Sequence, residues 1–410
     1  MSRQMKDSGI PWIGEVPDDW NIFPAKGVFL ERKILCGEAD IHLTPSQAHG
    51  VLPQAEYMEQ TGNRVVLNLA GSDKMKHVEP NDFIIHLRSF QGGIEFSRHA
   101  GKVSMAYTVL TPNGDHVIPT YFRWLLKSSA FISALAATTD QLRDGQSINY
   151  QTFGSLRLPV PPAEEQRRIA DYLDRETAEI DAFIADQQQL IQLLTERRAE
   201  EIRRCVTKGL ASAPTLKPSG VDWLGDVNNE WDIRRTRFLV DIRTGSGDTQ
   251  DANPDGEYPF YVRSDSPERS DSWDFEGEAV LTSGDGAGVG KVFHLVNGKY
   301  KAHQRVYLLG NFRQVTASYF YYAFSTFFAE VALDGSAKST VDSVRRHMLT
   351  ELPIPLPPLE EQIQIVNYLK GYVHQLDLII GDAERAIELS RERRAALITA
   401  AVTGKIQAPR

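Results

Sequence analysis

The sequence predicts an α+β protein: two similar globular α/β bodies joined by two long antiparallel helices that form a coiled-coil spacer. Three observations support this fold class. The segment 156–210 returns at 352–406, within a C-terminal segment 352–410, and a short lead at the start of the chain returns at residue 219. The stretches between lead and helix also share an order of short strands followed by a helix. We therefore expect an internal duplication related by a pseudo-two-fold axis.

Each copy begins with a short lead rich in tryptophan and glycine. Ser8–Trp20 is matched by Ser219–Trp231, an offset of 211 residues. Both leads contain a Trp-Ile-Gly-Glu-Val or Trp-Leu-Gly-Asp-Val core, and we predict that their tryptophans are packing anchors. The leads define the expected domains, with a first lead and body at 1–155 and a second at 219–351.

The two bodies show the same order of predicted elements. β-like runs followed by one helix are expected in the first body at Arg64–Leu69, Asp82–Leu87, Val103–Leu110 and Tyr121–Ala137, and in the second body at Ala279–Thr282, Lys291–Leu295, Val306–Leu309 and Ala317–Ala332. Weak identity persists at an offset of 197 residues, for example between Phe96 and Phe293. The bodies are therefore expected to share one fold and to carry different surfaces.

Each body is followed by a segment that predicts one helix of about 44 residues, or about 65 Å. A proline pair and a Glu-Glu-Gln sequence open both copies, and Gly209 follows the first. Acidic residues gather at the start and basic residues at the end, so we expect the copies to pack antiparallel. The predicted seam residues are Ile169, Leu173, Ile180, Leu194, Ile365, Leu369, Leu376 and Ile387. Residues 211–218 are expected to be a linker between the halves.

Composition limits the function of this chain. With 410 residues, 41% hydrophobic and 24% charged, it has room for several ordinary domains. The net charge of -9 argues against a protein that grips nucleic acid through a basic surface alone. Two cysteines suit a reducing compartment. Because we find no leader and no apolar run near the roughly 18 residues of a membrane span, we expect the chain in the cytoplasm and not in a membrane.

The glycine-rich stretch Gly284–Lys291 does not fit a phosphate-binding loop. No Ser or Thr follows Lys291, and position 285 is Asp where that pattern requires Gly. We predict a flexible loop that joins two strands and can present backbone amides and Lys291 to a nucleic acid. Arg88–Gly93 occupies the matching place in the first body.

We find no catalytic, cofactor-binding or metal-binding residues. Asp18, Glu31 and Lys33 resemble the carboxylate and lysine set of metal-dependent nucleases, which leaves a nuclease as an alternative function. Asp18 lies in the repeated lead, whose second copy has Asn228 there, and this favours a structural turn. Histidines at metal-ligand spacing, a nucleophile elbow and the Asn/Asp-Pro-Pro-aromatic motif of adenine methyltransferases are all missing from the sequence.

The repeated order of lead, body and helix resembles the specificity subunits of type I restriction-modification systems. The residues that carry this resemblance are the Ser-Gly-Ile-Pro-Trp-Ile-Gly-Glu-Val-Pro lead and the Leu-Pro-Val-Pro-Pro-Ala-Glu-Glu-Gln entry to the helix. The resemblance implies that each body is a target recognition domain reading half of a bipartite, asymmetric sequence in double-stranded DNA. It also implies two adenine methyltransferase subunits docked on the helices and a translocating nuclease subunit outside them. S-adenosylmethionine, ATP and magnesium would then belong to those partners.

Polar residues at loops and strand ends are the candidate DNA-binding residues. They are Arg88, Ser89, Gln91, Arg98, Lys102 and Tyr107 in the first body, and Ser283, Asp285, Lys291, Lys299, His303, Gln304 and Arg305 in the second. Two further alternatives stay open: a specificity subunit of a related system that cuts on both sides of its site, and a coiled-coil scaffold without sequence preference.

Overall fold

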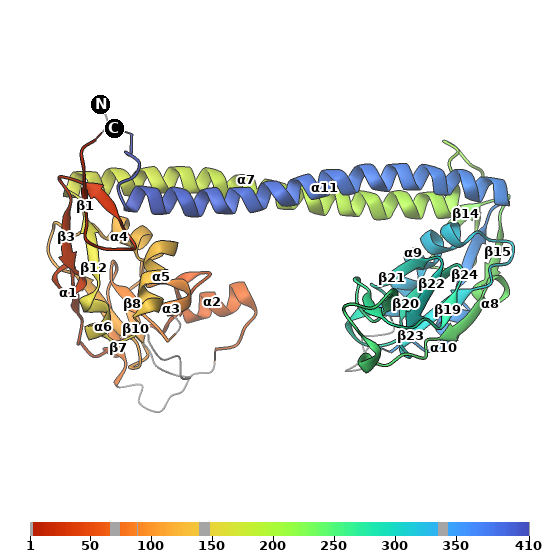
Figure 1. Ribbon diagram of the computed structural model, residues 1–410, viewed down its shortest axis with the longest axis horizontal. Coiled ribbons are helices and arrows are strands. Elements are labelled where there is room, and N and C mark those ends of the chain that lie inside the picture. The colour runs from red at the N-terminus through yellow and green to blue at the C-terminus, as the bar shows by residue number, and fades with distance from the viewer. Residues whose placement is uncertain (1–2, 66–73, 88, 139–147, 335–342, 410) are drawn as a thin grey trace. The chain divides into compact units, whose positions relative to one another are not determined.

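The computed structural model describes residues 3–65, 74–87, 89–138, 148–334 and 343–409 (Figure 1). The chain divides into two compact units, Met1–Gln187 with Arg385–Arg410, and Gln188–Glu384. Each unit contains one globular body, the first part of one long helix and the last part of the other. Among the described helices, none combines the length and apolar character of a membrane span.

The first unit is built from short strands and helices around a large hydrophobic core and a second, smaller hydrophobic cluster. Its elements before the long helix are β1 Met5–Asp7, β2 Glu15–Pro17, β3 Asn21–Pro24, α1 Ala25–Val28, β4 Phe29–Glu31, β5 Leu43–Ser46, β6 Gly50–Pro53, α2 Gln54–Thr61, β7 Lys76–Val78, β8 Phe83–Ile85, α3 Ser89–Gly92, β9 Glu95–Phe96, β10 Gly101–Val103, β11 Thr108–Pro112, α4 Pro119–Leu125, α5 Ser129–Ala137, α6 Tyr150–Ser155 and β12 Arg157–Val160. The long helix α7 follows at Ala163–Lys208.

The second unit repeats this order of elements with additional strands. It contains β13 Leu216–Pro218, β14 Asp226–Asn228, β15 Asp232–Arg235, α8 Thr236–Leu239, β16 Asp241–Thr244, the 3-10 turn η2 Thr249–Asp251, β17 Tyr258–Tyr261, β18 Glu268–Ser270, β19 Phe275–Glu276, β20 Ala279–Ser283, η3 Gly286–Gly288, β21 Phe293–Val296, β22 Lys299–Ala302, β23 Val306–Gly310, α9 Ala317–Asp334, α10 Arg346–Thr350 and β24 Pro353–Leu356. The second long helix, α11, is Leu359–Val402.

Sheet topology confirms that the bodies share a fold. The central antiparallel sheet has the order β4-β11-β8-β9 in the first body and β16-β23-β20-β21 in the second. In both bodies the strand before the long helix pairs with the strand after the lead, β12 with β3 and β24 with β15. The second body adds the sheet β18-β17-β22-β19, which brings the loops after β17 and β22 to one edge.

Several predicted elements differ from the structure. The run Val103–Leu110 is split between β10 and β11, because a turn closes where the Tyr107 amide donates to the Ser104 carbonyl. The helix predicted at Tyr121–Ala137 is two helices, α4 and α5, since the Ser128 side chain accepts from the Phe131 amide and starts a new helix. Most of the strand predicted at Arg64–Leu69 lies outside the described residues.

The boundaries around the long helices also differ. The predicted helical segments at 156–210 and 352–410 each begin with a strand, and helices start only at Ala163 and Leu359. The reason is that the residues before each proline pair hydrogen-bond to β3 or β15. The end of the predicted linker at 211–218 is β13, which pairs with β14 as β1 pairs with β2 in the first lead.

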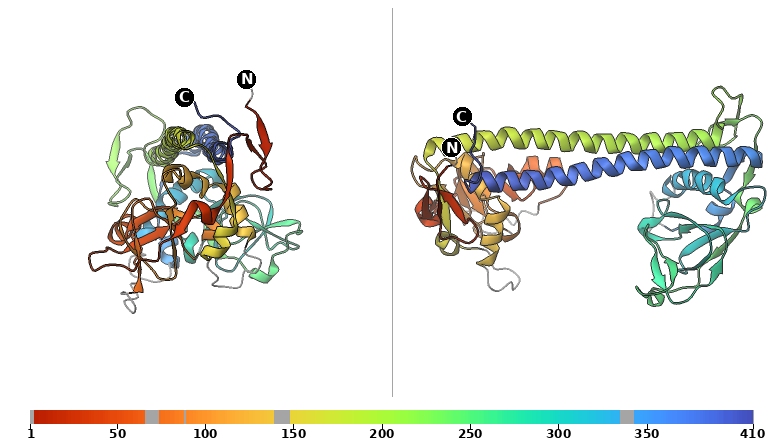
Figure 2. Two further views of the ribbon diagram at one scale, coloured as in Figure 1. Left: turned by 90° about the vertical axis from the view of Figure 1, so that its left-hand side faces the viewer. Right: turned by 45° about the horizontal axis from the view of Figure 1, so that its top comes forward.

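The two long helices pair antiparallel within each unit (Figures 1 and 2). In the first unit Arg394 lies 2.9 Å from the Asp181 carboxylate, and in the second Arg198 lies 2.7 Å from Asp377. These pairs are related by the 196-residue repeat, from 181 to 377 and from 198 to 394. Basic residues in the second half of each helix therefore pair with acidic residues in the first half of the other, in keeping with the predicted antiparallel packing.

Each body core receives the C-terminal end of a long helix. In the first unit the Tyr121 hydroxyl donates to the Val402 carbonyl at 3.0 Å, and in the second Tyr319 donates to Val206 at 3.3 Å. The lead tryptophans Trp20 and Trp231 are fully buried in these cores, as predicted for packing anchors. Each core is thus completed by the C-terminal end of a long helix, which in the first unit comes from the other end of the chain.

The predicted seam residues fall into three groups. Ile169, Leu173, Ile365 and Leu369 are buried in the two body cores. Ile180, Leu376 and Ile387 are buried but belong to neither body core, which is the position expected for a seam between helices. Leu194 is only half-buried.

Candidate nucleic-acid interface

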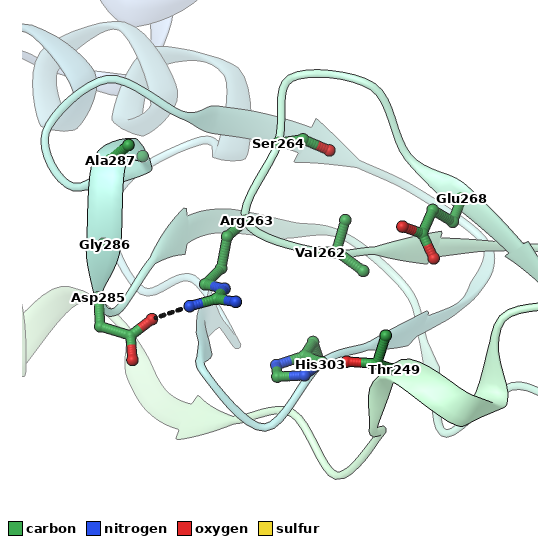
Figure 3. Close-up of a pocket in the computed structure, with 10 residues that line it drawn as sticks. Thr249, Val262, Arg263, Ser264, Glu268, Asp285, Gly286, Ala287 and His303 are labelled. Carbon is green, nitrogen blue, oxygen red and sulfur yellow. Dashed lines mark hydrogen bonds and ion pairs between the residues drawn. The ribbon is translucent and has the colours of Figure 1, made fainter. Parts of the chain in front are cut away.

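A recess in the second body collects polar side chains from several loops (Figure 3). It has a volume of about 440 Å³ and is lined by Thr249, Val262, Arg263, Ser264, Glu268, Asp285, Gly286, Ala287, Gly288 and His303. The recess lies where the glycine-rich loop between β20 and β21 meets the loops after β17 and β22. Strand pairing in two different sheets brings these loops together.

Asp285 is the centre of a charged network in this recess. One carboxylate oxygen accepts from Arg263 at 2.9 Å, and the other accepts from Arg305. Burial acts to raise the pKa of Asp285, but the hydrogen bonds from Arg305 and Arg263 outweigh it and hold the pKa below its usual range. Asp285 therefore stays ionised and fixes both guanidinium groups.

The glycines of the loop allow it to pack closely against the loops that carry the arginines. A Cβ atom on Gly288 would lie 2.6 Å from the Arg263 carbonyl oxygen, and one on Gly284 would lie 2.7 Å from the Arg305 carbonyl oxygen. Gly286 has a positive φ of 72°. The glycine pattern thus serves backbone packing at the recess, which explains why it matches no phosphate-binding motif.

Other candidates in the second body differ in exposure. Ser283 is buried and donates to the Asp285 carbonyl at 2.9 Å, so its hydroxyl holds the loop. His303 is also buried, and its Nδ1 accepts from the Arg305 amide at 3.1 Å, which leaves Nε2 as the donor of the neutral ring. The exposed candidates are Lys291, Lys299, Gln304 and Arg305, and the Lys299 ammonium lies 4.6 Å from the centre of the Trp273 ring.

The first-body candidates are less concentrated. Ser89 is fully buried and its hydroxyl accepts from the His86 amide at 2.9 Å, and the His86 ring contacts the Tyr107 ring. Lys102 lies on β10, opposite His77 on β7. Gln91 and Arg98 are exposed, and Arg88 lies outside the described residues. The structure thus joins Ser89 and Tyr107 through His86, and Lys102 belongs to a separate polar group.

That second group surrounds His77. Its Nε2 and Nδ1 lie 2.8 Å from Glu79 and 2.8 Å from Asp40, respectively. Hydrogen bonding to Glu79, followed by Asp40, outweighs burial and raises the pKa of His77. The imidazole is therefore held in place by two carboxylates on the surface of the first body.

Arg263, Thr249 and Glu268 were not singled out by the sequence. Arg263 lies in the loop after β17, Thr249 begins η2 and Glu268 begins β18, and none of them belongs to a motif. The pairing of strands in the sheet β18-β17-β22-β19 helps to bring them beside Asp285 and His303. Four predicted residues do meet here, because Ser283, Asp285, His303 and Arg305 are linked by direct hydrogen bonds.

The residues of the alternative nuclease site are not assembled. Lys33 lies 3.6 Å from the Glu31 carboxylate, whereas Asp18 follows β2 in the lead, where its carbonyl accepts from Lys6. Within the described ranges, His, Cys, Asp and Glu side chains form no group of three that could hold a metal ion.

The duplicated architecture matches a known family twice. A family model described as the type I restriction modification DNA specificity domain matches residues 17–193 and again residues 228–388. The chain belongs to this family. Its two matches coincide with the two bodies and the beginnings of their long helices, so each repeat carries one specificity domain.

Curated relatives of this chain are named as specificity subunits of type I restriction enzymes. It is 23% identical, over 96% of its length and 95% of the relative's, to a putative type I restriction enzyme MjaX specificity subunit of Methanocaldococcus jannaschii. It is 26% identical to the type I restriction enzyme EcoDI specificity subunit of Escherichia coli over 44% of this chain and 40% of that one. The relatives are thus named for specificity, not for catalysis.

A solved structure shares the fold. A chain from a study of complex assembly and conformational transition of the type I R-M system superposes with a TM-score of 0.65 and 17% identity, covering 95% of this chain and 99% of that one. The fold of this chain is therefore known from experiment.

Proposed function

We propose that this chain is the non-catalytic DNA specificity subunit of a type I restriction-modification complex, in which each body reads one half of a bipartite target in double-stranded DNA. The observation that carries this proposal is the pair of specificity domains with identical central sheet order and different loop side chains. Because the loops differ, the two half-sites should differ in sequence. The chain would act in the cytoplasm.

The paired helices would fix the separation of the half-sites. At 46 and 44 residues the helices are about 65 to 70 Å long. DNA half-sites on one face of a duplex repeat about every 34 to 36 Å, so paired helices of this length are long enough to select one spacing. Ion pairs of Arg394 with Asp181 and of Arg198 with Asp377 support a defined helix register.

We also infer that two adenine methyltransferase subunits dock on the helices. Large apolar side chains remain exposed there: Phe183 and Leu389 in the first unit, and Leu190, Leu193, Leu378 and Ile379 in the second. In the first unit they border a groove of about 530 Å³. The partners would supply S-adenosylmethionine chemistry and much of the phosphate grip that a chain of net charge -9 lacks. A nuclease subunit that uses ATP and magnesium would bind outside them.

Exchanging the first body tests whether each body reads only its own half of the target. Residues 25–155 lie between β3 and β12, so replacing them with the corresponding segment of the EcoDI specificity subunit preserves the strand pair that joins body to helix. The hybrid is co-expressed with the methyltransferase subunit of this system, and methylated adenines are mapped by sequencing. One half of the target should change and the other half should persist. A change in both halves, or in neither, contradicts the proposal.

A charged residue in the groove tests docking. Leu389→Asp replaces a side chain that is 58% exposed, so the fold should be retained. We expect loss of methylation together with loss of co-purification of the methyltransferase subunit. Unchanged co-purification would place the docking surface elsewhere. Mapping the cleavage positions relative to the methylated target tests the alternative system that cuts on both sides of its site, because cuts in that case flank the target.

A further inference from the structure

The recess in the second body has a charge balance that suits a neutral base edge better than a phosphate. Arg263 and Glu268 line it, Asp285 forms its glycine-loop side, and Arg305 shares Asp285 with Arg263. Two arginines are thus matched by two carboxylates. A phosphate anion would meet no net positive charge here, whereas a ligand that both accepts and donates hydrogen bonds would find both kinds of partner.

The two arginines are held ready to donate. Asp285 binds one terminal nitrogen of each guanidinium, and among the described residues the remaining side-chain nitrogens of Arg263 and Arg305 donate to no other group. Both side chains are about half exposed, at 47% and 57%. The flat fork of an arginine whose position is already fixed loses little freedom on binding a planar partner.

The partner with matching geometry is guanine. Its O6 and N7 atoms are two adjacent acceptors on the major-groove edge, and bidentate arginine is the commonest specific contact to them. The cytosine paired with that guanine exposes its N4 amino group, which can donate a hydrogen bond to a carboxylate. Glu268 lies on the opposite side of the recess from Asp285 (Figure 3).

We propose that Arg263 and Arg305, positioned by Asp285, read guanine, so that the half-site of the second body contains at least one G·C pair. This inference rests on the proposed function. In the first body the equivalent β8–β9 connection carries the buried Ser89, and the buried Glu95 at the start of β9 accepts a hydrogen bond from Lys127 at 2.7 Å. The two bodies therefore present different chemistry at this place.

The test uses lysine substitutions. Arg263→Lys and Arg305→Lys keep the charge and remove the bidentate fork. Each full-length variant is co-expressed with the methyltransferase subunit of this system, and the methylated target is mapped. Arg313→Lys is the matched control, because Arg313 is 51% exposed and pairs with Asp241 at 2.6 Å but lies outside the recess.

The expected result is confined to one half of the target. Discrimination at a guanine of the second half-site should fall by about 5- to 150-fold, the worth of one bidentate base contact, while the first half-site and the Arg313→Lys target stay unchanged. A second half-site without a G·C pair overturns the inference, as does a target that both recess variants leave intact. Uniformly weaker methylation without relaxed sequence would indicate phosphate contact and also overturns it. If the wild-type complex recognises no sequence at all, the proposed function fails as well.

Discussion

Gln362, the glutamine of the second Glu-Glu-Gln sequence, ties the second body to the start of its long helix. The side chain is fully buried. Its Oε1 accepts from the Thr316 amide at 2.8 Å, and its Nε2 donates to the carbonyls of Gln314 and Pro357 at 3.0 and 2.9 Å. Gln362→Ala removes all three hydrogen bonds and leaves three backbone groups without that partner.

The expected loss follows from this count. At about 1 kcal/mol net for each hydrogen bond, Gln362→Ala should lower the free energy of unfolding of the second unit by about 3 kcal/mol. For a unit of this size the melting temperature should fall by about 6 to 12 °C. Differential scanning calorimetry of the full-length chain measures this change.

Gln364→Ala is the control on the same helix. Gln364 is exposed, and surface substitutions of this kind usually change stability by less than about 0.5 kcal/mol. If Gln362→Ala and Gln364→Ala melted at the same temperature, the role assigned to the buried amide would be wrong. Gln166 makes the equivalent bonds to Ile118, His116 and Pro161 in the first unit, so Gln166→Ala should destabilise that unit similarly.

Three further predictions concern buried and titrating side chains. Burial raises the pKa of Cys205 to about 12. A Cys36→Ser protein, in which Cys205 is the remaining thiol, should therefore react with a thiol reagent at pH 8 only when it unfolds. Rapid labelling of the native protein would contradict this. The raised pKa of His77 gives a stabilisation that is complete below the unfolded pKa of about 6.5 and is lost as pH rises through the folded pKa. The difference in melting temperature between wild type and His77→Gln should therefore be larger at pH 6 than at pH 8.5, and equal differences would refute the assignment. Ile387→Asp, at a seam position only 7% exposed, should cost several kcal/mol in thermal melts, whereas Leu389→Asp should cost little; equal stabilities would remove Ile387 from the seam.

Much of the architecture was predictable because it depends on short local sequence signals and on a sequence repeat that occurs in both halves of the chain. A proline pair and an acidic first turn precede or begin each long helix, and Gly209 follows the first one. In the structure both helices begin within a few residues of these signals, and the first ends directly before Gly209. Repetition then identified the leads, the shared body fold and the family. These features depend on neighbours along the chain or on a constant offset, both of which the sequence displays directly.

Contacts between distant segments decided the rest. Leu173 and Leu369 have the spacing of seam residues, but they lie in body cores because β12 and β24 pair back onto the bodies and carry the first helical turns with them. Likewise, Arg263 is an unremarkable loop residue until β17 pairs with β22 and brings it to Asp285. Helix ends, repeats and family membership follow from the sequence, since their causes are local or periodic. The composition of the recess does not, because its charged groups are brought together only by pairing between strands that are far apart in the chain.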